Sequence, residues 1–170
     1  KGSLNHNSRK FHAKNTDPNR THWNVEYCNE DIKDVYHELF DDALKRYNDK
    51  QTRKDRKIDD YYEKIRSGKQ EKLFHEVILQ IGDKDNMGSE TMEGQLAAKI
   101  LDEYMKGFQE RNPTLRVFAA HLHLDEATPH LHIDFIPYVT GSKRGLDTRV
   151  SLKQALSSLG FKGGSRSETE

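Results

Sequence analysis

Cysteine, proline and long apolar runs are scarce in this chain of 170 residues, which has one Cys, four Pro and a formal net charge of zero at pH 7. Because Cys28 stands alone, the chain cannot form an internal disulfide, and this cysteine content fits a reducing cytoplasm. No apolar run approaches the ~20 residues that span a bilayer, and no signal peptide is visible. With zero net charge, affinity for a nucleic acid must come from local clusters of Lys and Arg.

The hydrophobic pattern predicts an α+β fold. In chain order we expect helices over 31–47 and 58–68, a strand over 73–83, a helix over 92–111, strands over 115–125 and 129–139, and a helix over 151–160. The first strand is rich in β-branched residues and is expected to be largely buried, and Ser151 with Gln154 forms a capping box for the last helix. Long helices between groups of strands indicate an antiparallel β-sheet with helices packed on it.

The length of the chain fits one domain. We place this domain at 1–163 and a polar tail at 164–170. Since the chain starts at Lys1 without a methionine, we expect an N-terminal fragment of a longer protein and assign any oligomerisation to the missing C-terminal region.

The stretch HLHLDEATPHLH, from His121 to His132, contains four of the nine histidines. Strand alternation places His123 on one face of its strand and His130 with His132 on one face of the next strand, so pairing through the turn brings three imidazoles within a few ångström. Neutral imidazoles are common metal ligands, and three of them leave coordination positions open for water or substrate. We predict these three as ligands and leave out His121, which is farther from the turn.

Glu126 lies in this turn and is expected to be either a fourth ligand or a group that orients a histidine through a hydrogen bond. The alternative is a polar sheet face whose histidines hydrogen-bond to helices. We favour this less, because several histidines fall on the same face of the two strands. Nitrogen ligands suit Mn²⁺, Co²⁺, Ni²⁺ or Zn²⁺ better than Mg²⁺, which prefers oxygen.

Three stretches of the chain carry a family resemblance. HLDEATPHLH resembles the H-x-D-E-x-T-P-H-x-H motif of the plasmid mobilisation and recombination (Pre/Mob) relaxases, which belong to the HUH endonucleases, and HLH at 130–132 is its pair of histidines around a hydrophobic residue. IPY and the later SKRGLDTRVSLKQALSSLGFKG look like the segment that follows this motif, and NHNSRKFHAKNTDPNRTHWN near the start looks like the first motif of the family. The resemblance is weakest over 31–70.

The resemblance implies an HUH relaxase-like fold and a metal-dependent enzyme of the bacterial cytoplasm. Such an enzyme nicks one strand of DNA at a plasmid transfer origin, forms a 5′-phosphoryl-protein adduct and rejoins the strand by reversal, which initiates conjugative mobilisation. It implies His6 as the nucleophile and Arg9 as a phosphate-binding residue; a neutral imidazole has a usable lone pair near neutral pH. It also implies Mn²⁺ or Mg²⁺, and with the nitrogen ligands we expect Mn²⁺, with Mg²⁺ as the alternative.

The expected partner is single-stranded DNA, and basic or polar residues in two regions are candidates for contacting it. These candidates are Arg9, Asn15, Arg20, Lys143, Arg144, Arg149 and Lys153. The charged run over 45–57 also contains acids, so we expect a solvated helical linker there.

Three other functions remain open. A rolling-circle replication initiator would use a tyrosine nucleophile, but Tyr61 and Tyr62 follow helical spacing that predicts packing. A nucleotide hydrolase of the histidine-triad kind is disfavoured because Asp125 replaces the third histidine. A non-catalytic DNA-binding module with a structural metal is disfavoured because such sites usually include cysteine.

Overall fold

The computed structural model describes residues 4–11 and 13–161, which form two compact units. Among the described residues, the first unit consists of 4–11, 13–30, 76–111 and 117–135, and the second consists of 31–75, 112–116 and 136–161. Within the described ranges, no helix has both the length and the apolar character needed to span a membrane. The expected tail at 164–170 lies outside the described residues, and the domain bounds 1–163 stay a prediction.

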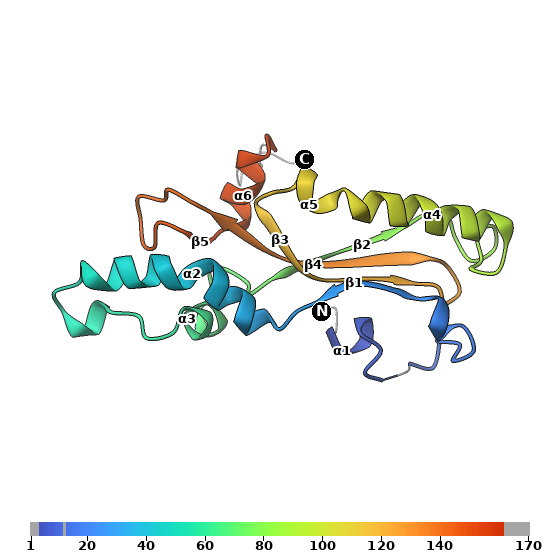
Figure 1. Cartoon of the computed structure of the whole chain (residues 1–170), viewed down its shortest axis with the longest axis horizontal. Coiled ribbons are helices and arrows are strands. Elements are labelled where there is room, and N and C mark those ends of the chain that lie inside the picture. Colours follow the sequence, from blue (N-terminus) through green and yellow to red (C-terminus); the bar gives the residue numbers. More distant parts are fainter. Residues whose placement is uncertain (1–3, 12, 162–170) are drawn as a thin grey trace. The chain divides into compact units, whose positions relative to one another are not determined.

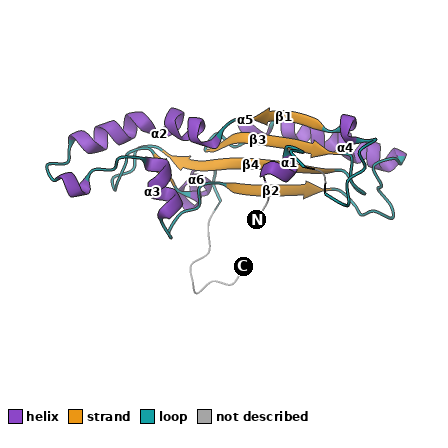
Figure 2. Ribbon diagram, turned by 90° about the horizontal axis from the view of Figure 1, so that it is seen from below, coloured by secondary structure: helices purple, strands orange, loops and turns teal. Residues whose placement is uncertain are grey.

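An antiparallel sheet forms the centre of the first unit. Its strands lie in the order β1 (Val25–Asn29), β3 (Leu115–His123), β4 (His130–Val139) and β2 (His75–Gln80), as Figures 1 and 2 show. The two central strands are buried almost throughout, and they form the predicted hairpin. β2 was expected to be largely buried, but this is wrong: it is an edge strand, and Ile78 is 53% exposed.

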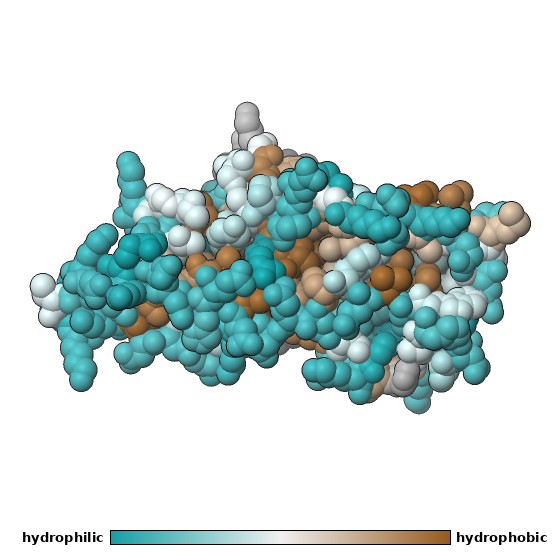
Figure 3. All heavy atoms as spheres, in the orientation of Figure 1, coloured by the Kyte–Doolittle hydropathy of each residue, from teal (hydrophilic) through white to brown (hydrophobic). Residues whose placement is uncertain are grey.

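The helix α4 (Met92–Lys106) covers one face of this sheet (Figure 1). Tyr27 on β1 donates a hydrogen bond to Asp102 on α4 with an O–O distance of 2.7 Å. Five residues of the helix are buried, and three of them are small: Gly94, Ala97 and Ala98 stand beside the larger Leu101 and Met105. Four of the larger apolar residues that predicted the helix are exposed, namely Met92, Leu96, Ile100 and Tyr104, whereas Leu101 and Phe108 are buried. Hydrophobic patches are visible over α4 in Figure 3. The predicted helix does not run unbroken to 111, because Gly107 ends α4 before the short α5 (Phe108–Arg111).

The N-terminal segment lies on the opposite face of the sheet (Figure 2), in the short helix α1 (Leu4–Asn7) and the 3₁₀ turn η1 (Thr21–Trp23). The sequence predicted neither these turns nor β1, since the first 30 residues are polar and lack a clear period. Asn7 is 1% exposed and anchors α1 against the sheet.

The second unit contains three helices and a short strand that pairs antiparallel with the end of β4. They are α2 (Ile32–Asp49), α3 (Tyr61–Ser67), β5 (Arg149–Val150) and α6 (Leu152–Ser158), with a 3₁₀ turn η2 (Lys54–Arg56) between the first two helices. Phe40 and Tyr61 pack with ring centroids 5.0 Å apart between α2 and α3, so Tyr61 serves packing as predicted. The Ser151 side chain accepts a hydrogen bond from the Gln154 backbone N–H, which confirms the predicted helix start.

Candidate metal centre and its surroundings

Three imidazoles converge on the face of the central hairpin that α1 covers. The ring centroids of His123, His130 and His132 lie 4.8 to 5.2 Å apart. Each offers one ring nitrogen, and these nitrogens all lie within 4.8 Å of one another. The parity argument from the sequence therefore placed the three rings correctly. His121 was left out, and its Nε2 lies 3.2 Å from a Glu26 carboxylate oxygen on β1.

Each of the three rings is oriented through its other nitrogen. His123 Nε2 is 2.8 Å from the Asn7 carbonyl oxygen, His130 Nδ1 is 2.8 Å from the Thr128 carbonyl oxygen, and His132 Nδ1 is 2.7 Å from Glu76 Oε1. Carbonyl and carboxylate oxygens only accept, so these three nitrogens carry the protons of the neutral rings. The lone pairs then lie on His123 Nδ1, His130 Nε2 and His132 Nε2.

The donor set fits a transition-metal ion. His132 Nε2 is buried and has no hydrogen-bond partner among the described residues, and a buried polar atom without a partner is costly unless something binds it. Histidines that bind metals usually donate their other ring N–H to a carboxylate or carbonyl, the pattern found here three times. Whether the three rings bind an ion stays a prediction.

The sequence did not reveal two residues that support this site. Glu76 Oε1 accepts from His132 and also from Asn7 Nδ2, at 2.8 Å. Asn7 further donates to Asp134 Oδ2 at 3.2 Å, so one buried side chain connects α1, β2 and β4. Asn7 stands inside NHNSRKFHAKNTDPNRTHWN, the stretch that resembles the first motif of the family, which was a signal for its importance, whereas nothing near Glu76 in the sequence indicated its role.

Burial controls the charge of this face. Burial lowers the pKa of His123 to about 3 and also lowers that of His132, although Glu76 opposes the shift of His132. Burial raises the pKa of Asp134 to about 7, and the Glu76 carboxylate adds to this shift. The rings of His123 and His132 therefore stay neutral below the ordinary histidine pKa, and a neutral ring is the form that binds a metal.

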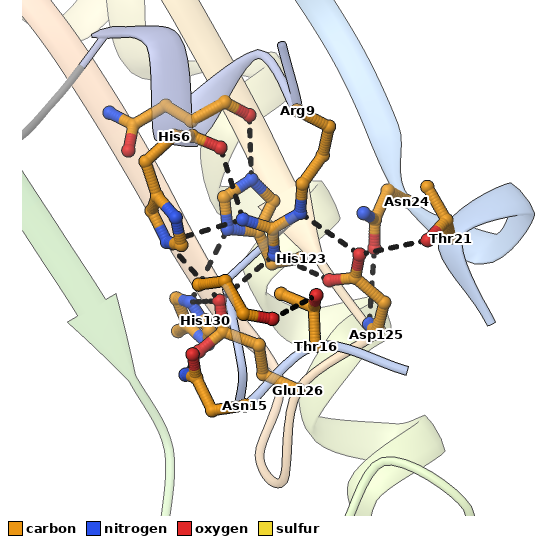
Figure 4. A network of polar contacts seen from close by, with 12 residues as sticks. His6, Arg9, Asn15, Thr16, Thr21, Asn24, His123, Asp125, Glu126 and His130 are labelled. Atoms are coloured by element: carbon orange, nitrogen blue, oxygen red, sulfur yellow. Dashed lines mark hydrogen bonds and ion pairs between the residues drawn. The ribbon is translucent and has the colours of Figure 1, made fainter. Parts of the chain in front are cut away.

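His6 lies beside the three rings (Figure 4). Its ring centroid is 5.9 Å from that of His123 and 6.5 Å from that of His132. Its Nε2 lies 3.3 Å from Glu126 Oε1. His6, Glu126, His130 and His132 line an open cavity of about 340 Å³. The sequence-predicted nucleophile, ligands and Glu126 are thus together in one unit.

Arg9 is held by carboxylates (Figure 4). Its guanidinium forms two hydrogen bonds to Asp125, through Nε and Nη2, and a third, of 2.9 Å, to Glu126 Oε1. Burial opposes ionisation of Asp125, but the Arg9 guanidinium outweighs it and the pKa of Asp125 falls to about 2. Arg9 also has a positive φ of 52°, an uncommon conformation outside glycine that is often found at functional sites.

The other DNA-contact candidates are divided between the units. Asn15 Nδ2 donates to Glu126 Oε2 at 2.7 Å, and Arg20 donates to the carbonyl oxygens of Leu124 and Glu126, so both support the turn of the hairpin. The remaining four belong to the second unit; they are Lys143, Arg144, Arg149 and Lys153. Contact with DNA stays a prediction for all of them.

The fold and the candidate site together define the class of protein. An antiparallel sheet whose central hairpin bears a His-x-His pair and a third histidine, beside a basic N-terminal segment, is the architecture of a DNA relaxase of HUH type.

Comparison with known proteins then gives the family. Residues 3–160 match the model of Mob_Pre, described as plasmid recombination enzyme. The chain belongs to this family and is a relaxase-type enzyme. No curated protein sequence matches it.

Solved structures of one relative are also similar. A crystal structure of the MobM relaxase domain, Mn-bound at pH 5.5 with 22 nucleotides of plasmid pMV158 oriT DNA, is 25% identical with a TM-score of 0.51. The match covers 98% of this chain and 86% of that one. Another, Mn-bound at pH 6.5 with 23 nucleotides, is 25% identical over 98% and 83% of the two chains with a TM-score of 0.46.

Proposed function

We propose that this chain nicks and rejoins one strand of DNA at a plasmid transfer origin, with a divalent cation held by His123, His130 and His132 and with His6 as the nucleophile. The observation that carries this proposal is the convergence of three imidazole nitrogens, each ring oriented through its other nitrogen, next to a fourth imidazole. Membership of the plasmid recombination enzymes supports the substrate class.

Mn²⁺ is the proposed ion. Three nitrogen donors suit it better than Mg²⁺, and the similar MobM relaxase domain is Mn-bound at pH 5.5, below the ordinary histidine pKa of ~6.5. The lowered pKa of His123 and His132 would let this chain bind the ion under the same conditions. When bound, the ion would neutralise charge on the oxygens of the scissile phosphate.

His6 would attack the phosphorus with an imidazole lone pair. Nε2 of His6 has two neighbours, Glu126 Oε1 at 3.3 Å and Arg9 Nη1 at 3.2 Å, which favour opposite tautomers. The attack uses the tautomer whose proton points to Glu126, in which the lone pair lies on Nδ1. The new N–P bond forms while the bond from phosphorus to the 3′ oxygen breaks, and this oxygen takes a proton from water to leave as a 3′-hydroxyl. The ring proton passes toward the Glu126 carboxylate, which leaves a phosphoramidate on the 5′ side. Attack of the 3′-hydroxyl on this adduct reverses the steps and rejoins the strand.

Arg9 has two parts in the proposal. Its contacts with Asp125 and Glu126 fix both the N-terminal segment and the turn, and so they position His6 and Glu126. Its Nη1 lies 3.2 Å from His6 Nε2, which places positive charge near the reacting group and would stabilise an approaching phosphate.

The tyrosine alternative has less support. None of the residues that line the cavity beside the three rings is a tyrosine. Tyr61 is 7% exposed and accepts a hydrogen bond from the Val150 backbone N–H, so it belongs to the core of the second unit. A structural metal site in a non-catalytic module is also disfavoured, because His6, Glu126 and an open cavity adjoin the three ligands.

The test is the formation of a covalent protein–DNA adduct. The chain is incubated with Mn²⁺ and a labelled single-stranded transfer-origin oligonucleotide, and the products are separated on a denaturing gel. We expect the adduct to disappear with His6→Ala and with chelator and to persist with Tyr62→Phe. His22→Ala is the matched control, since His22 is an exposed histidine of the same segment.

The chemistry of the adduct separates the two nucleophiles. A phosphoramidate on histidine is labile in acid and survives alkali, whereas a phosphotyrosine ester survives acid. An acid-stable adduct, or loss of the adduct only with Tyr62→Phe, would show that His6 is not the nucleophile. Adduct formation in the presence of chelator would show that the reaction does not require a metal ion. If no origin sequence gives an adduct, the enzymatic proposal is wrong.

A further inference from the structure

The second unit contains a cavity that the nicking chemistry does not use. It measures about 670 Å³ and is lined by residues of α2, α3 and the loop that leads into β5. This volume is within the range of ~300–1,000 Å³ typical of small-molecule sites. All of its lining residues belong to the second unit.

The floor of this cavity is apolar and partly aromatic. Leu146 and Val150 are 2% and 1% exposed and form part of it. Tyr61 stands against them, with its hydroxyl accepting from the Val150 backbone N–H at 3.2 Å. Tyr47, on the last turns of α2, is less buried and adds a second ring to the wall. Such a floor can hold a flat aromatic group.

The rim is basic. Lys64, Lys69, Arg144 and Arg149 line the cavity against one acid, Glu71. In the part of the chain that the structure describes, none of these four cations is in an ion pair, and Arg149 donates only to the neutral side chains of Ser142 and Gln154. Their charge is therefore available to an anion.

A neighbouring cavity in the same unit gives the contrast. It measures about 370 Å³ and is lined by Asp41, Asp59 and Asp60 with Lys45 and His37. Carboxylates of this kind repel phosphate, so the basic rim belongs to one cavity and is not a general property of the unit.

We propose that this cavity, which we call the α3–β5 pocket, binds one unpaired nucleotide of the DNA strand, with the base against the apolar floor and Tyr47 and the flanking phosphates at the basic rim. A nucleotide combines a flat apolar face with anionic phosphates, the two properties that floor and rim complement. The inference rests on the proposed function, which supplies the DNA strand, and it assigns Lys64, Lys69 and Tyr47 to DNA contact alongside Arg144 and Arg149.

The first experiment measures affinity for the origin oligonucleotide by fluorescence anisotropy over a series of salt concentrations, with chelator present to prevent cleavage. The test variant is Lys64→Gln with Arg144→Gln, both exposed residues of the rim. The control is Lys45→Gln with Lys50→Gln, an exposed lysine of α2 and the exposed lysine that caps its C-terminal end; both lie outside the pocket, and the change alters the charge of the same unit equally. We expect the slope of log affinity against log salt to fall by about 1.4 in the test variant only, from ~0.7 per phosphate contact on a single strand.

The second experiment asks whether a base enters the pocket. Oligonucleotides that each carry one abasic position are bound to the wild type and to Tyr47→Leu, which keeps an apolar side chain but removes the ring. We expect one position at which loss of the base weakens wild-type binding about fivefold or more, and at which Tyr47→Leu is insensitive.

The outcomes separate this inference from the proposed function. If the wild type forms the covalent adduct but the rim variant keeps the same salt slope as the control, or no abasic position is coupled to Tyr47, the pocket is overturned and the nicking function stands. If the wild type neither binds nor cleaves the strand, the proposed function fails and the pocket fails with it.

Discussion

Glu76 is the residue whose role can be tested most sharply. Its Oε1 accepts from His132 Nδ1 at 2.7 Å and from Asn7 Nδ2 at 2.8 Å, and neither contact was visible in the sequence. If Glu76 fixes the tautomer and orientation of His132, replacing its charge should weaken metal binding while the fold persists. Glu76→Gln is the conservative change, because its amide oxygen can still accept both hydrogen bonds.

The size of the effect follows from the lost charge. A carboxylate that accepts from a metal-bound histidine raises the basicity of the ligand, and removing such a partner typically costs 10- to 100-fold in metal affinity. We therefore expect the Mn²⁺ affinity of Glu76→Gln to fall by about this factor, or about 1.4–2.7 kcal/mol. Glu76→Ala should lose more, since it leaves buried His132 Nδ1 without an acceptor and Asn7 Nδ2 with Asp134 as its remaining one.

The assay is calorimetric titration of the chain with Mn²⁺, with thermal unfolding of the metal-free variants measured in parallel. Glu26→Gln is the matched control. Glu26 Oε2 lies 3.2 Å from His121 Nε2, so this change also removes a carboxylate from a buried histidine of the sheet, one that is not among the predicted ligands. We expect Glu26→Gln to bind Mn²⁺ as the wild type does.

Two results would refute this reasoning. If Glu76→Gln binds Mn²⁺ with wild-type affinity while it remains folded, then Glu76 does not position a ligand. If Glu26→Gln weakens binding as much as Glu76→Gln does, then His121 belongs to the ligand set and the selection of the three histidines is wrong.

Other substitutions and conditions test the electrostatics of the site. Burial lowers the pKa of His123 to about 3 and lowers that of His132, so the rings stay neutral on acidification; calorimetry should show Mn²⁺ affinity falling less than ~100-fold between about pH 7.5 and pH 5.5, against ~1,000-fold for three ordinary histidines. The pKa of Asp134, raised to about 7 by burial, means that the folded state holds a proton that the unfolded state releases above ~3.9, so metal-free stability is lost as pH rises through 7. Asp134→Asn should remove this loss, so that its free energy of unfolding in urea rises relative to wild type by on the order of 2–4 kcal/mol as the pH increases from about 5 to 8. If the free energy of unfolding depends on pH in the same way in both proteins, Asp134 does not hold this proton. Arg9→Ala leaves buried Asp125 without its guanidinium and should lower the free energy of unfolding by about 3 kcal/mol; unchanged stability would mean that the ion pair does not hold the N-terminal segment.

The three candidate ligands could be predicted from the sequence because their relative positions depend on one short hairpin. A hairpin with a short turn fixes which side chains share a face, and parity alone places His123 beside His130 and His132. Glu76 could not be found in this way, since it is 56 residues from His132 and strand order is decided by packing of the whole sheet. The position of His6 beside the ligands was implied by family resemblance and not by any pattern of its own segment.

The prediction of β2 failed for a related reason. A run of β-branched and apolar residues indicates a strand but not its place in the sheet. At the edge, β2 has a neighbour on one side only, so Ile78 is exposed while Glu76, on the same face and nearer the ligands, is largely covered. From the sequence, a carboxylate at such a position is expected on the surface. In the structure, Glu76 accepts a hydrogen bond from His132.

The face that α4 buries connects core packing to the candidate site. Periodicity did not show which residues of α4 face the sheet: Gly94, Ala97 and Ala98 are buried beside Leu101 and Met105, whereas Met92 and Leu96 are exposed. The small residues on the buried face allow the helix to approach the sheet closely. Gly94 has to be small, since a Cβ there would collide with the carbonyl of Gly88. The segment that Gly94 admits carries Ser89, whose backbone N–H donates to the Ala127 carbonyl at 3.1 Å and whose hydroxyl donates to the Glu126 carbonyl at 2.9 Å. Gly94, on the buried face of α4, thus supports the turn that places Glu126 beside His6.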